Sequence, residues 1–277
     1  MNDVNTDRLR NKVIVIVGGT SGLGLSAARA CVREGAATVI VGRNERKCTA
    51  AAAELGDQSR AIAGDACEPQ TVIAAIQEAV AAFGGFHGLY HVAGGSGRRQ
   101  GDGPLDQLSD QGWDHTMHLN LDSVFYSNRA AIQQFLRQGT GGSVVNMASV
   151  LADSPSPRFF ATHAYATSKA ATIGMTKAAA AYYAPRNIRL NVIAPALVDT
   201  PLVKRAIEDD AIMRYVASKQ PLDGGRIGVP ADVDDAVVYF LSDEARFVTG
   251  QVLRVDGGWS LTEGQYEPTS ASDTDAT

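Results

Sequence analysis

Short runs of β-branched and other apolar residues alternate along the chain with longer segments in which apolar residues recur at helical spacing. Such alternation predicts βαβ units and a parallel sheet that helices cover on both faces. The runs lie at 13–17, 38–41, 88–92, 143–147, 189–193 and 251–255. We therefore predict an α/β fold with a doubly wound parallel sheet of about seven strands flanked by helices.

Three of the intervening segments have the pattern of amphipathic crossover helices. Segment 25–35 ends at Gly35, segment 230–242 opens with Pro230, and segment 68–85 has apolar residues at helical spacing. Glycine stops helices, and proline is favoured at their first position. These segments therefore predict the helices that join parallel strands.

The length and the distribution of polar residues predict a single domain over residues 13–260. Residues 1–12 form a polar N-terminal arm, and residues 261–277 are rich in Ser, Thr, Asp and Glu, which predicts a disordered tail. Residues 196–225 are long for a structureless connection, so we predict a substrate lid with some helix there.

Charge and hydropathy exclude several classes of protein. The formal net charge of −5 and scattered Lys and Arg residues argue against binding to nucleic acid. No apolar run approaches the roughly 20 residues that cross a bilayer, and the N-terminus lacks an apolar targeting segment. We therefore expect a cytoplasmic protein that does not bind membranes.

Cysteine and histidine residues give no metal signal. Cys31, Cys48 and Cys67 are widely separated and form no Cys-x-x-Cys pair, so neither a disulfide framework nor a zinc site is indicated. His115 and His118 lie three residues apart, but no third ligand accompanies them. We expect free thiols and no metal.

A glycine-rich turn follows the first predicted strand in "VGGTSGLGLSAARA". Gly18, Gly22 and Gly24 allow a tight turn, a close approach of backbone to phosphate, and a pyrophosphate at the helix N-terminus. Gly22, Gly24 and Ala27 match G-x-G-x-x-A but start late after the strand, so the match is approximate. The alternative is that these glycines serve helix–strand packing alone.

The end of the second predicted strand indicates which dinucleotide fits. An acidic residue there would accept hydrogen bonds from a ribose 2′-hydroxyl, but the chain has Gly42 and Arg43. A guanidinium pairs well with a 2′-phosphate. The pattern favours NADP(H) over NAD(H), with a solvated or adenine-stacking Arg43 as the alternative.

Tyr165 and Lys169 lie four residues apart, which places both on one face of a helix. A phenol would need its pKa lowered by about 3 units to be half ionised at neutral pH, and a nearby ammonium and a cationic nicotinamide both act in that direction. This pair alone is a weak signal, because Tyr-x-x-x-Lys is common by chance.

Further residues strengthen the signal: Ser149 follows the fifth strand, and Asn120 lies on a preceding helix. With these residues, the chain over about residues 12–260 resembles the short-chain dehydrogenase/reductase family, in its single-domain branch with G-x-x-x-G-x-G and Tyr-x-x-x-Lys motifs. The resemblance also includes "NVIAPALVDTP" at 191–201. It implies a Rossmann fold.

The resemblance implies a catalytic role for four residues. Tyr165 would be the general acid in ketone reduction or the base in alcohol oxidation, and Lys169 would lower its pKa and bind the nicotinamide ribose. Ser149 would donate to the substrate oxygen, and Asn120 would hold a water for proton relay.

The same resemblance implies contacts to the coenzyme. Asp65 would meet the adenine amino group, and Val198 and Thr200 the nicotinamide carboxamide. The full set of expected coenzyme-binding residues is Gly18, Thr20, Ser21, Gly22, Leu23, Gly24, Arg43, Asp65, Ala66, Ala93, Gly94, Tyr165, Lys169, Val198 and Thr200.

Three departures from the family pattern concern the site. Residues 91–94 read His-Val-Ala-Gly where the family has Asn-Asn-Ala-Gly, so His91 replaces side-chain bonds that steady the sheet or leaves them missing. Ala196 adds a methyl group where a glycine is usual. The interval 149–165 is longer than usual, which predicts a reshaped pocket wall.

Substrate-binding residues are harder to predict. Arg98 and Arg99 in the loop after the fourth strand, with Arg158, form a candidate cationic entrance for a carboxylate, phosphate or sulfonate. Solvated loop arginines or subunit-interface pairs are the alternative. His163 is a further candidate for contact with substrate.

These observations predict an NAD(P)-dependent oxidoreductase that transfers a hydride between nicotinamide and a small ketone or secondary alcohol, with NADP(H) favoured. The alternatives are an NAD-dependent dehydrogenase of a polyol or hydroxy acid, reduction of a carrier-bound fatty-acyl group, and a catalytically silent nucleotide-sensing protein. The resemblance further implies pairing of the Asn120 and Tyr165 helices between subunits, hence a homodimer or homotetramer.

Overall fold

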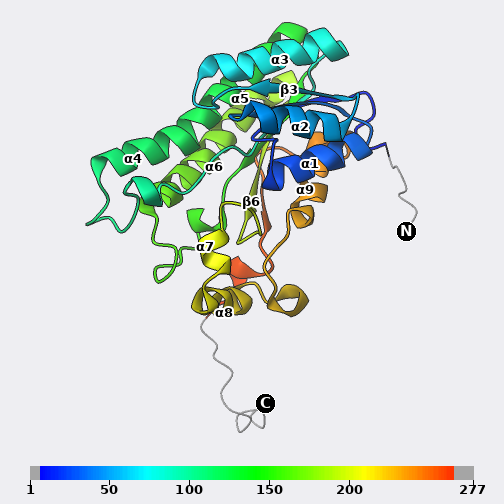
Figure 1. The fold of residues 1–277 in the computed structure, drawn as a ribbon. Helices are drawn as coiled ribbons and strands as arrows, with labels where there is room; N and C mark the ends of the chain where they lie inside the picture. Colours follow the sequence, from blue (N-terminus) through cyan, green and yellow to red (C-terminus); the bar gives the residue numbers. More distant parts are fainter. Residues whose placement is uncertain (1–6, 265–277) are drawn as a thin grey trace.

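The computed structural model describes residues 7–264 and has one seven-stranded, wholly parallel sheet. The strand order is β3-β2-β1-β4-β5-β6-β7. This confirms the predicted doubly wound Rossmann fold (Figure 1). The strands are β1 Val13–Val17, β2 Ala37–Gly42, β3 Ser59–Ala63, β4 Gly88–His91, β5 Gly142–Met147, β6 Ile188–Pro195 and β7 Val252–Val255.

Six of these strands match the six apolar runs to within one or two residues at each end, and β3 is the strand that the apolar pattern misses. Its sequence, SRAIA, has only its first residue buried, because β3 is an edge strand that pairs with β2 alone. Edge strands are half solvated, so they need no continuous apolar run.

Helices form a layer on each face of the sheet (Figure 1). Successive residues of a strand point to opposite faces, so Ile14 and Ile16 of β1 pack with α1, α2 and α9, whereas Val13 and Val15 pack with α3, α5 and α6. The helices are α1 Gly22–Arg33, α2 Glu45–Leu55, α3 Pro69–Phe83, α4 Asp110–Met117, α5 Ser123–Gln138, α6 His163–Tyr183, α7 Lys204–Ile207, α8 Asp210–Lys219 and α9 Ala231–Leu241.

The strand order reverses between β1 and β4, which are neighbours in the sheet although β2 and β3 lie between them in sequence. In open α/β sheets, ligands bind beyond the carboxyl ends of the strands at such a reversal. The glycine turn after β1 and the loop after β4 meet at this point.

Segment 196–225, predicted as a substrate lid, contains α7, α8 and a 3-10 turn at Leu222–Gly225. Ala206, Ile212 and Val216 of this segment pack with Val150 and with residues near Trp259 in a small apolar cluster apart from the two main ones. The segment therefore lies over the carboxyl edge of the sheet (Figure 1), and its action as a lid stays a prediction.

The structure describes residues 7–12 of the N-terminal arm and residues 261–264 of the predicted tail. Within the N-terminal arm, Leu9 is fully buried and Arg8 pairs with Glu244, so residues 7–12 pack on the domain. Of the predicted tail, only the first four residues are described, and the remainder lies outside the described residues. None of the described helices is long and apolar enough to cross a membrane.

Candidate active site

The glycine turn between β1 and α1 is shaped by close backbone contacts. Gly18 has a φ of +96°, and a Cβ on it would lie 2.7 Å from the backbone nitrogen of Ala93. A Cβ on Gly24 would lie 2.0 Å from the carbonyl oxygen of Gly18. Packing alone therefore accounts for these two glycines, so the glycines do not by themselves prove a nucleotide site.

Other features of the turn fit an anion. Ser21 is the N-cap residue of the 12-residue helix α1, but its side chain accepts no hydrogen bond from the helix. The first N–H groups of α1 therefore face the turn without a side-chain acceptor from Ser21. Thr200 lies against the same turn, since a Cβ on Gly22 would be 3.3 Å from its methyl group. The turn and the loop after β6 thus form two sides of one cradle that fits a coenzyme pyrophosphate.

The other predicted coenzyme residues lie around this cradle. Thr20 packs against Gly42 at the end of β2, and Gly94 lies so close to Asn120 that a Cβ on Gly94 would be 2.7 Å from Oδ1. Asp65 accepts a hydrogen bond from the backbone nitrogen of Cys67 at 2.9 Å. The residues converge as expected, and their contacts with a coenzyme stay predictions.

Arg43 is exposed at the end of β2 and forms no ion pair within the described residues. Its charge acts on Cys67, which follows β3, so the guanidinium lies on the side of the cradle where β2 and β3 end. An unpaired guanidinium at this edge is available to a phosphate.

Ser149 and Tyr165 come together from two elements. Ser149 follows β5, where its hydroxyl accepts a hydrogen bond from the backbone nitrogen of Leu151 at 3.2 Å, and Tyr165 lies in the first turn of α6. The Ser149 hydroxyl also lies near the phenol of Tyr165, because it acts to lower the pKa of that phenol. Two neighbouring hydroxyls of this kind present a paired site for one oxygen atom of a ligand.

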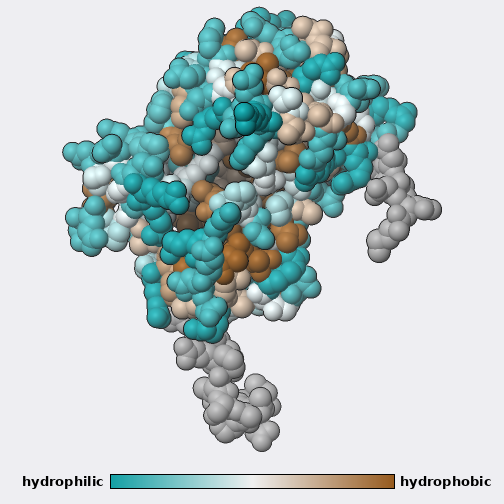
Figure 2. Space-filling model, viewed as in Figure 1, coloured by the Kyte–Doolittle hydropathy of each residue, from teal (hydrophilic) through white to brown (hydrophobic). Residues whose placement is uncertain are grey.

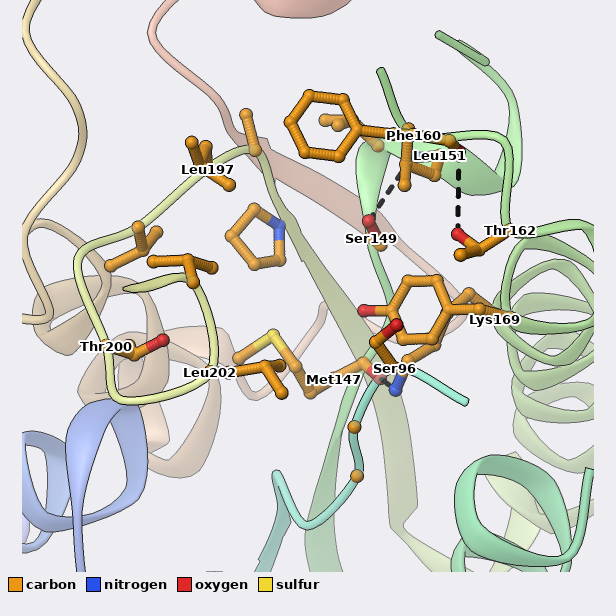
Figure 3. A pocket seen from close by; sticks show the side chains of 18 of the residues that line it. Ser96, Met147, Ser149, Leu151, Phe160, Thr162, Lys169, Leu197, Thr200 and Leu202 are labelled. Carbon is orange, nitrogen blue, oxygen red and sulfur yellow. Dashed lines mark hydrogen bonds between the residues drawn. The ribbon is translucent and has the colours of Figure 1, made fainter. Parts of the chain in front are cut away.

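Lys169 lies one turn along α6 from Tyr165 and is buried. Its Nζ is 5.5 Å from the centroid of the Tyr165 ring and donates to the carbonyl oxygen of Met147 at 2.9 Å. Figure 3 shows Ser149 and Lys169 on one side of the pocket and Leu197, Thr200 and Leu202 on the other.

Burial controls the protonation of both groups. It raises the pKa of Tyr165, against which the Ser149 hydrogen bond acts, and it lowers the pKa of Lys169 to about 8. The sequence predicts a lowered pKa for Tyr165, so the direction in the protein alone is the opposite. The positive charge of Lys169 and that of a bound nicotinamide cation are the groups that would favour the phenolate.

Asn120 lies in a π-helical turn, His118–Asp122, between α4 and α5. Its amide donates to the carbonyl oxygens of Gly95 and Thr116 and accepts from the Gly95 nitrogen, all at 2.9 Å. Both amide donors are therefore in use. A water at Asn120 would have to bind the backbone carbonyl or the second lone pair of Oδ1.

His91 fills the place of the family's asparagine at the end of β4. The ring is buried, with Nδ1 2.9 Å from the Ser127 hydroxyl and Nε2 3.3 Å from that of Ser123. Burial, helped by the charge of Lys169, lowers the pKa of His91 to about 3. A neutral His91 thus joins β4 to α5. Its contacts with Ser123 and Ser127 replace the side-chain hydrogen bonds expected from the family's asparagine.

Asp102 is a site residue that sequence reasoning missed. It is buried in the loop after β4, and its two carboxylate oxygens accept hydrogen bonds from the backbone nitrogens of Ala164 and Tyr165, both at 3.0 Å. Thr162, at the start of α6, provides no side-chain cap. Asp102 therefore caps α6 from outside and fixes the turn that carries Tyr165.

A mainly apolar cavity joins these groups, and it opens near α7, where hydrophobic residues gather at the surface (Figure 2). Arg98 lines it as predicted, but Arg99, Arg158 and His163 do not. Instead Arg205, in the lid segment, lines it. The apolar lining residues include Val92, Met147, Val150, Leu151, Phe160, Ala196, Leu197, Leu202 and Trp259.

Other predicted candidates lie away from the cavity. Arg158 is exposed and stacks over the ring of Phe159, and His163 is exposed at the start of α6. His118 pairs with Asp122 rather than with His115. Within residues 7–264, no group of three His, Cys, Asp or Glu side chains gathers closely enough to hold a metal ion.

Comparison with known proteins places this arrangement among dehydrogenases. A family model described as "Enoyl-(Acyl carrier protein) reductase" matches residues 17–260. The chain is 33% identical to the 2,5-dichloro-2,5-cyclohexadiene-1,4-diol dehydrogenase LinX of Sphingobium indicum, over 92% of this chain and 98% of that protein. It is 32% identical to cyclohexanol dehydrogenase of an Acinetobacter species, over 94% of this chain and 99% of that protein.

A solved structure is similar in both sequence and fold. It is the structure of a short-chain type dehydrogenase/reductase from Mycobacterium ulcerans, with a TM-score of 0.84 and 33% sequence identity. The match covers 92% of this chain and 91% of that chain.

Proposed function

The chain belongs to the short-chain dehydrogenase/reductase family, and on this premise we propose that it transfers a hydride between NADP(H) and a small ketone or secondary alcohol. The observation that carries this proposal is that Ser149, Tyr165 and the buried Lys169 line one mainly apolar cavity together. Hydride transfer to carbon needs an apolar site, and the oxygen needs a proton donor.

The side chains divide the work at the substrate oxygen. Bound nicotinamide supplies the hydride in reduction and takes it in oxidation. The Ser149 hydroxyl donates to the carbonyl oxygen and stabilises the charge that develops there. Tyr165 gives its proton to that oxygen in reduction and removes it in oxidation. The ammonium of Lys169 favours the phenolate form of Tyr165 through its positive charge.

Arg43 supports NADP(H) over NAD(H). Its exposed guanidinium has no ion-pair partner within the described part of the chain, and it stands where a 2′-phosphate of adenosine ribose belongs in this fold. A guanidinium suits a phosphate through its bidentate fork.

The test is consumption of NADPH with a panel of cyclic and open-chain ketones, and reduction of NADP⁺ with the matching alcohols. We expect Tyr165→Phe to lower kcat/KM by at least about 100-fold with NADPH binding retained, because only the proton donor is removed. A wild-type protein that binds coenzyme but turns over no carbonyl or alcohol would support the silent nucleotide-sensing alternative instead.

Oxidation of an alcohol with NAD⁺ is the second candidate function. It is favoured by the relatives named for the oxidation of a cyclic diol and of cyclohexanol. The same panel run with NAD⁺ separates the two. The description of the family model names enoyl reduction. The Ser149 and Tyr165 hydroxyls, which line the same cavity, support carbonyl chemistry instead, because both can hydrogen-bond to an oxygen.

We further propose that the protein works in the cytoplasm as a homodimer or homotetramer. Aromatic side chains on the outward faces of α5 and α6 support this, because Phe125 is 43% exposed and Tyr182 is 77% exposed. Large exposed apolar groups on neighbouring helices are typical of surfaces that a second subunit covers.

A further inference from the structure

Two arginines from separate segments meet at the mouth of the cavity. Arg98 lies in the 3-10 turn Arg98–Gln100, and Arg205 lies in α7. A terminal guanidinium nitrogen of Arg98 donates to the carbonyl oxygen of Phe159 at 3.0 Å, and one of Arg205 donates to the same oxygen at 3.5 Å. Both residues line the cavity.

The contact with the Phe159 carbonyl oxygen uses only a few of the N–H donors of Arg98 and Arg205. Each guanidinium carries five N–H groups, and the contact with Phe159 takes one nitrogen of each. The remaining N–H groups lie at the cavity mouth, where both side chains are exposed enough to reach a ligand.

The Arg98–Arg205 pair also lacks a carboxylate partner that would offset the repulsion between its two positive charges. Neither Arg98 nor Arg205 forms an ion pair within residues 7–264, and burial, followed by the charge of Arg205, lowers the pKa of Arg98. Asp102 acts on Arg98 electrostatically, but both of its oxygens accept backbone hydrogen bonds from α6.

Some other arginines do have carboxylate partners. Five of them pair directly with carboxylates, through the contacts Arg8–Glu244, Arg10–Asp7, Arg29–Glu54, Arg226–Asp232 and Arg254–Asp153. Arg98 and Arg205 differ from the remaining arginines in lying together at the cavity that Tyr165 lines, where an oxyanion that both forks can reach would offset the repulsion between their charges.

We propose that Arg98 and Arg205 bind a carboxylate of the substrate, so that the enzyme acts on an oxo acid or hydroxy acid with an apolar body. The apolar part fits the walls formed by Leu151, Phe160 and Leu202. The proposal names the substrate class of the site and in that respect rests on the proposed function.

A coenzyme phosphate is the other oxyanion that arginines can bind. The two arginines share the carbonyl oxygen of Phe159, in the segment between Ser149 and Tyr165, whereas the phosphate cradle lies at the N-terminus of α1 beside Thr200. The position therefore favours the substrate, and the experiment separates the two sources.

The first measurement is calorimetric binding of cyclohexanecarboxylate and of the neutral cyclohexanecarboxamide to the NADPH complex. We expect the carboxylate to bind at least about 10-fold more tightly. Arg98→Ala and Arg205→Ala should each remove most of this preference and leave carboxamide binding unchanged. Arg99→Ala is the matched control, because Arg99 lies beside Arg98 but does not line the cavity.

Equal binding of the two probes, or an equal loss of preference in Arg99→Ala, would overturn the proposal. A parallel loss of NADPH affinity in the Arg98 and Arg205 variants would overturn it too, by assigning the arginines to the coenzyme. Because Arg98 also holds the Phe159 carbonyl, Arg98→Gln and Arg205→Gln are measured alongside, with unfolding curves that verify the fold.

Turnover separates this inference from the proposed function. Reduction of 4-oxocyclohexanecarboxylate is compared with that of its carboxamide, and we expect kcat/KM to favour the acid by about 10-fold through KM. Equal turnover of both contradicts the carboxylate site but keeps the reductase. Preferential binding of the acid without turnover of either keeps the carboxylate site but contradicts the reductase.

Discussion

At the scale of single residues, Lys169 is a buried cation. Its burial destabilises the folded protein, and under the proposed function the same buried charge acts on Tyr165. Burial disfavours the charged ammonium and lowers the pKa of Lys169 from 10.5 to about 8. At neutral pH the group is still protonated, so its positive charge acts close to Tyr165 with little screening by water. Under the proposed function, the same charge would favour the phenolate form of Tyr165.

The cost of burying Lys169 predicts a pH-dependent stability. Between pH 8 and 10.5 the unfolded chain binds a proton that the folded chain has lost, so the destabilisation is complete below pH 8 and is relieved as the pH rises to 10.5. Lys169→Met removes the charge. Its free energy of unfolding, relative to wild type, should fall by about 2 kcal/mol between pH 7 and about pH 9.5.

Urea unfolding at the two pH values measures this difference, and activity should be lost in the same variant. Lys177→Met, an exposed position on the same helix, controls for the loss of one charge. A stability difference for Lys169→Met that is the same at both pH values would contradict the buried cation.

Arg43 carries the prediction for coenzyme choice. Arg43→Ala should weaken NADPH binding by about 10-fold to 100-fold and change NADH binding little, because only NADPH has the 2′-phosphate that the guanidinium would pair with. Fluorescence titration with both coenzymes measures this, with Arg46→Ala on α2 as the control. An equal loss for the two coenzymes would instead indicate stacking on the adenine.

The residues that the sequence located and those it missed differ in the kind of signal they carry. Tyr165, Ser149 and Asn120 stand in motifs at fixed spacing, whereas Asp102 and Arg205 act through contacts with distant segments. Arg158 has the right residue type, yet it stacks on Phe159 outside the cavity. A single sequence does not reveal which loop arginine turns inward, because that depends on tertiary packing.

At the scale of the elements, the start of α6 is held by a loop far away in sequence. The two carboxylate oxygens of Asp102 accept hydrogen bonds from the backbone N–H groups of Ala164 and Tyr165 in the first turn of α6. The helix dipole also favours a negative charge at this end. The loop after β4 and the catalytic helix therefore hold each other in place.

This coupling predicts that Asp102→Ala lowers kcat more than it changes KM, because Tyr165 loses its fixed position. It should also lower the free energy of unfolding by about 1–3 kcal/mol, since two buried N–H groups lose their acceptor. Asp102→Asn, which keeps one acceptor oxygen, should recover part of kcat, and the exposed Asp106→Ala should change neither quantity. A kcat unchanged in Asp102→Ala would contradict a positioning role.

Among the elements, strands and helices with a buried face were predictable and the irregular ones were not. The apolar runs located six strands because parallel strands are buried on both faces. The edge strand β3 and the π-helical turn at His118–Asp122 have no such pattern. The sequence did not predict the π turn, because its i→i+5 hydrogen bonds are set by the fold rather than by residue type; such turns often mark functional sites.

At the scale of the whole molecule, Ser149, Tyr165 and Lys169 of one chain line a single cavity, whereas α5 and α6 carry large exposed side chains on their outward faces. Phe125 on α5 is 43% exposed even though Arg129 lies over its ring at 4.7 Å, and Tyr182 on α6 is 77% exposed. The family resemblance implies that these helices pair between subunits. Subunit pairing would stiffen the helix that carries Tyr165.

We therefore expect a mass in solution of two or four times 29.1 kDa at micromolar concentration, measured by light scattering or sedimentation. Phe125→Asp should shift the protein towards the monomer, because a carboxylate at an apolar interface loses its hydration. Leu105→Asp, at a loop position that is 71% exposed, is the matched control and should leave the mass unchanged. A wild-type protein that is monomeric at this concentration would contradict the assembly, and the catalytic groups of one chain would then have to act without a second subunit.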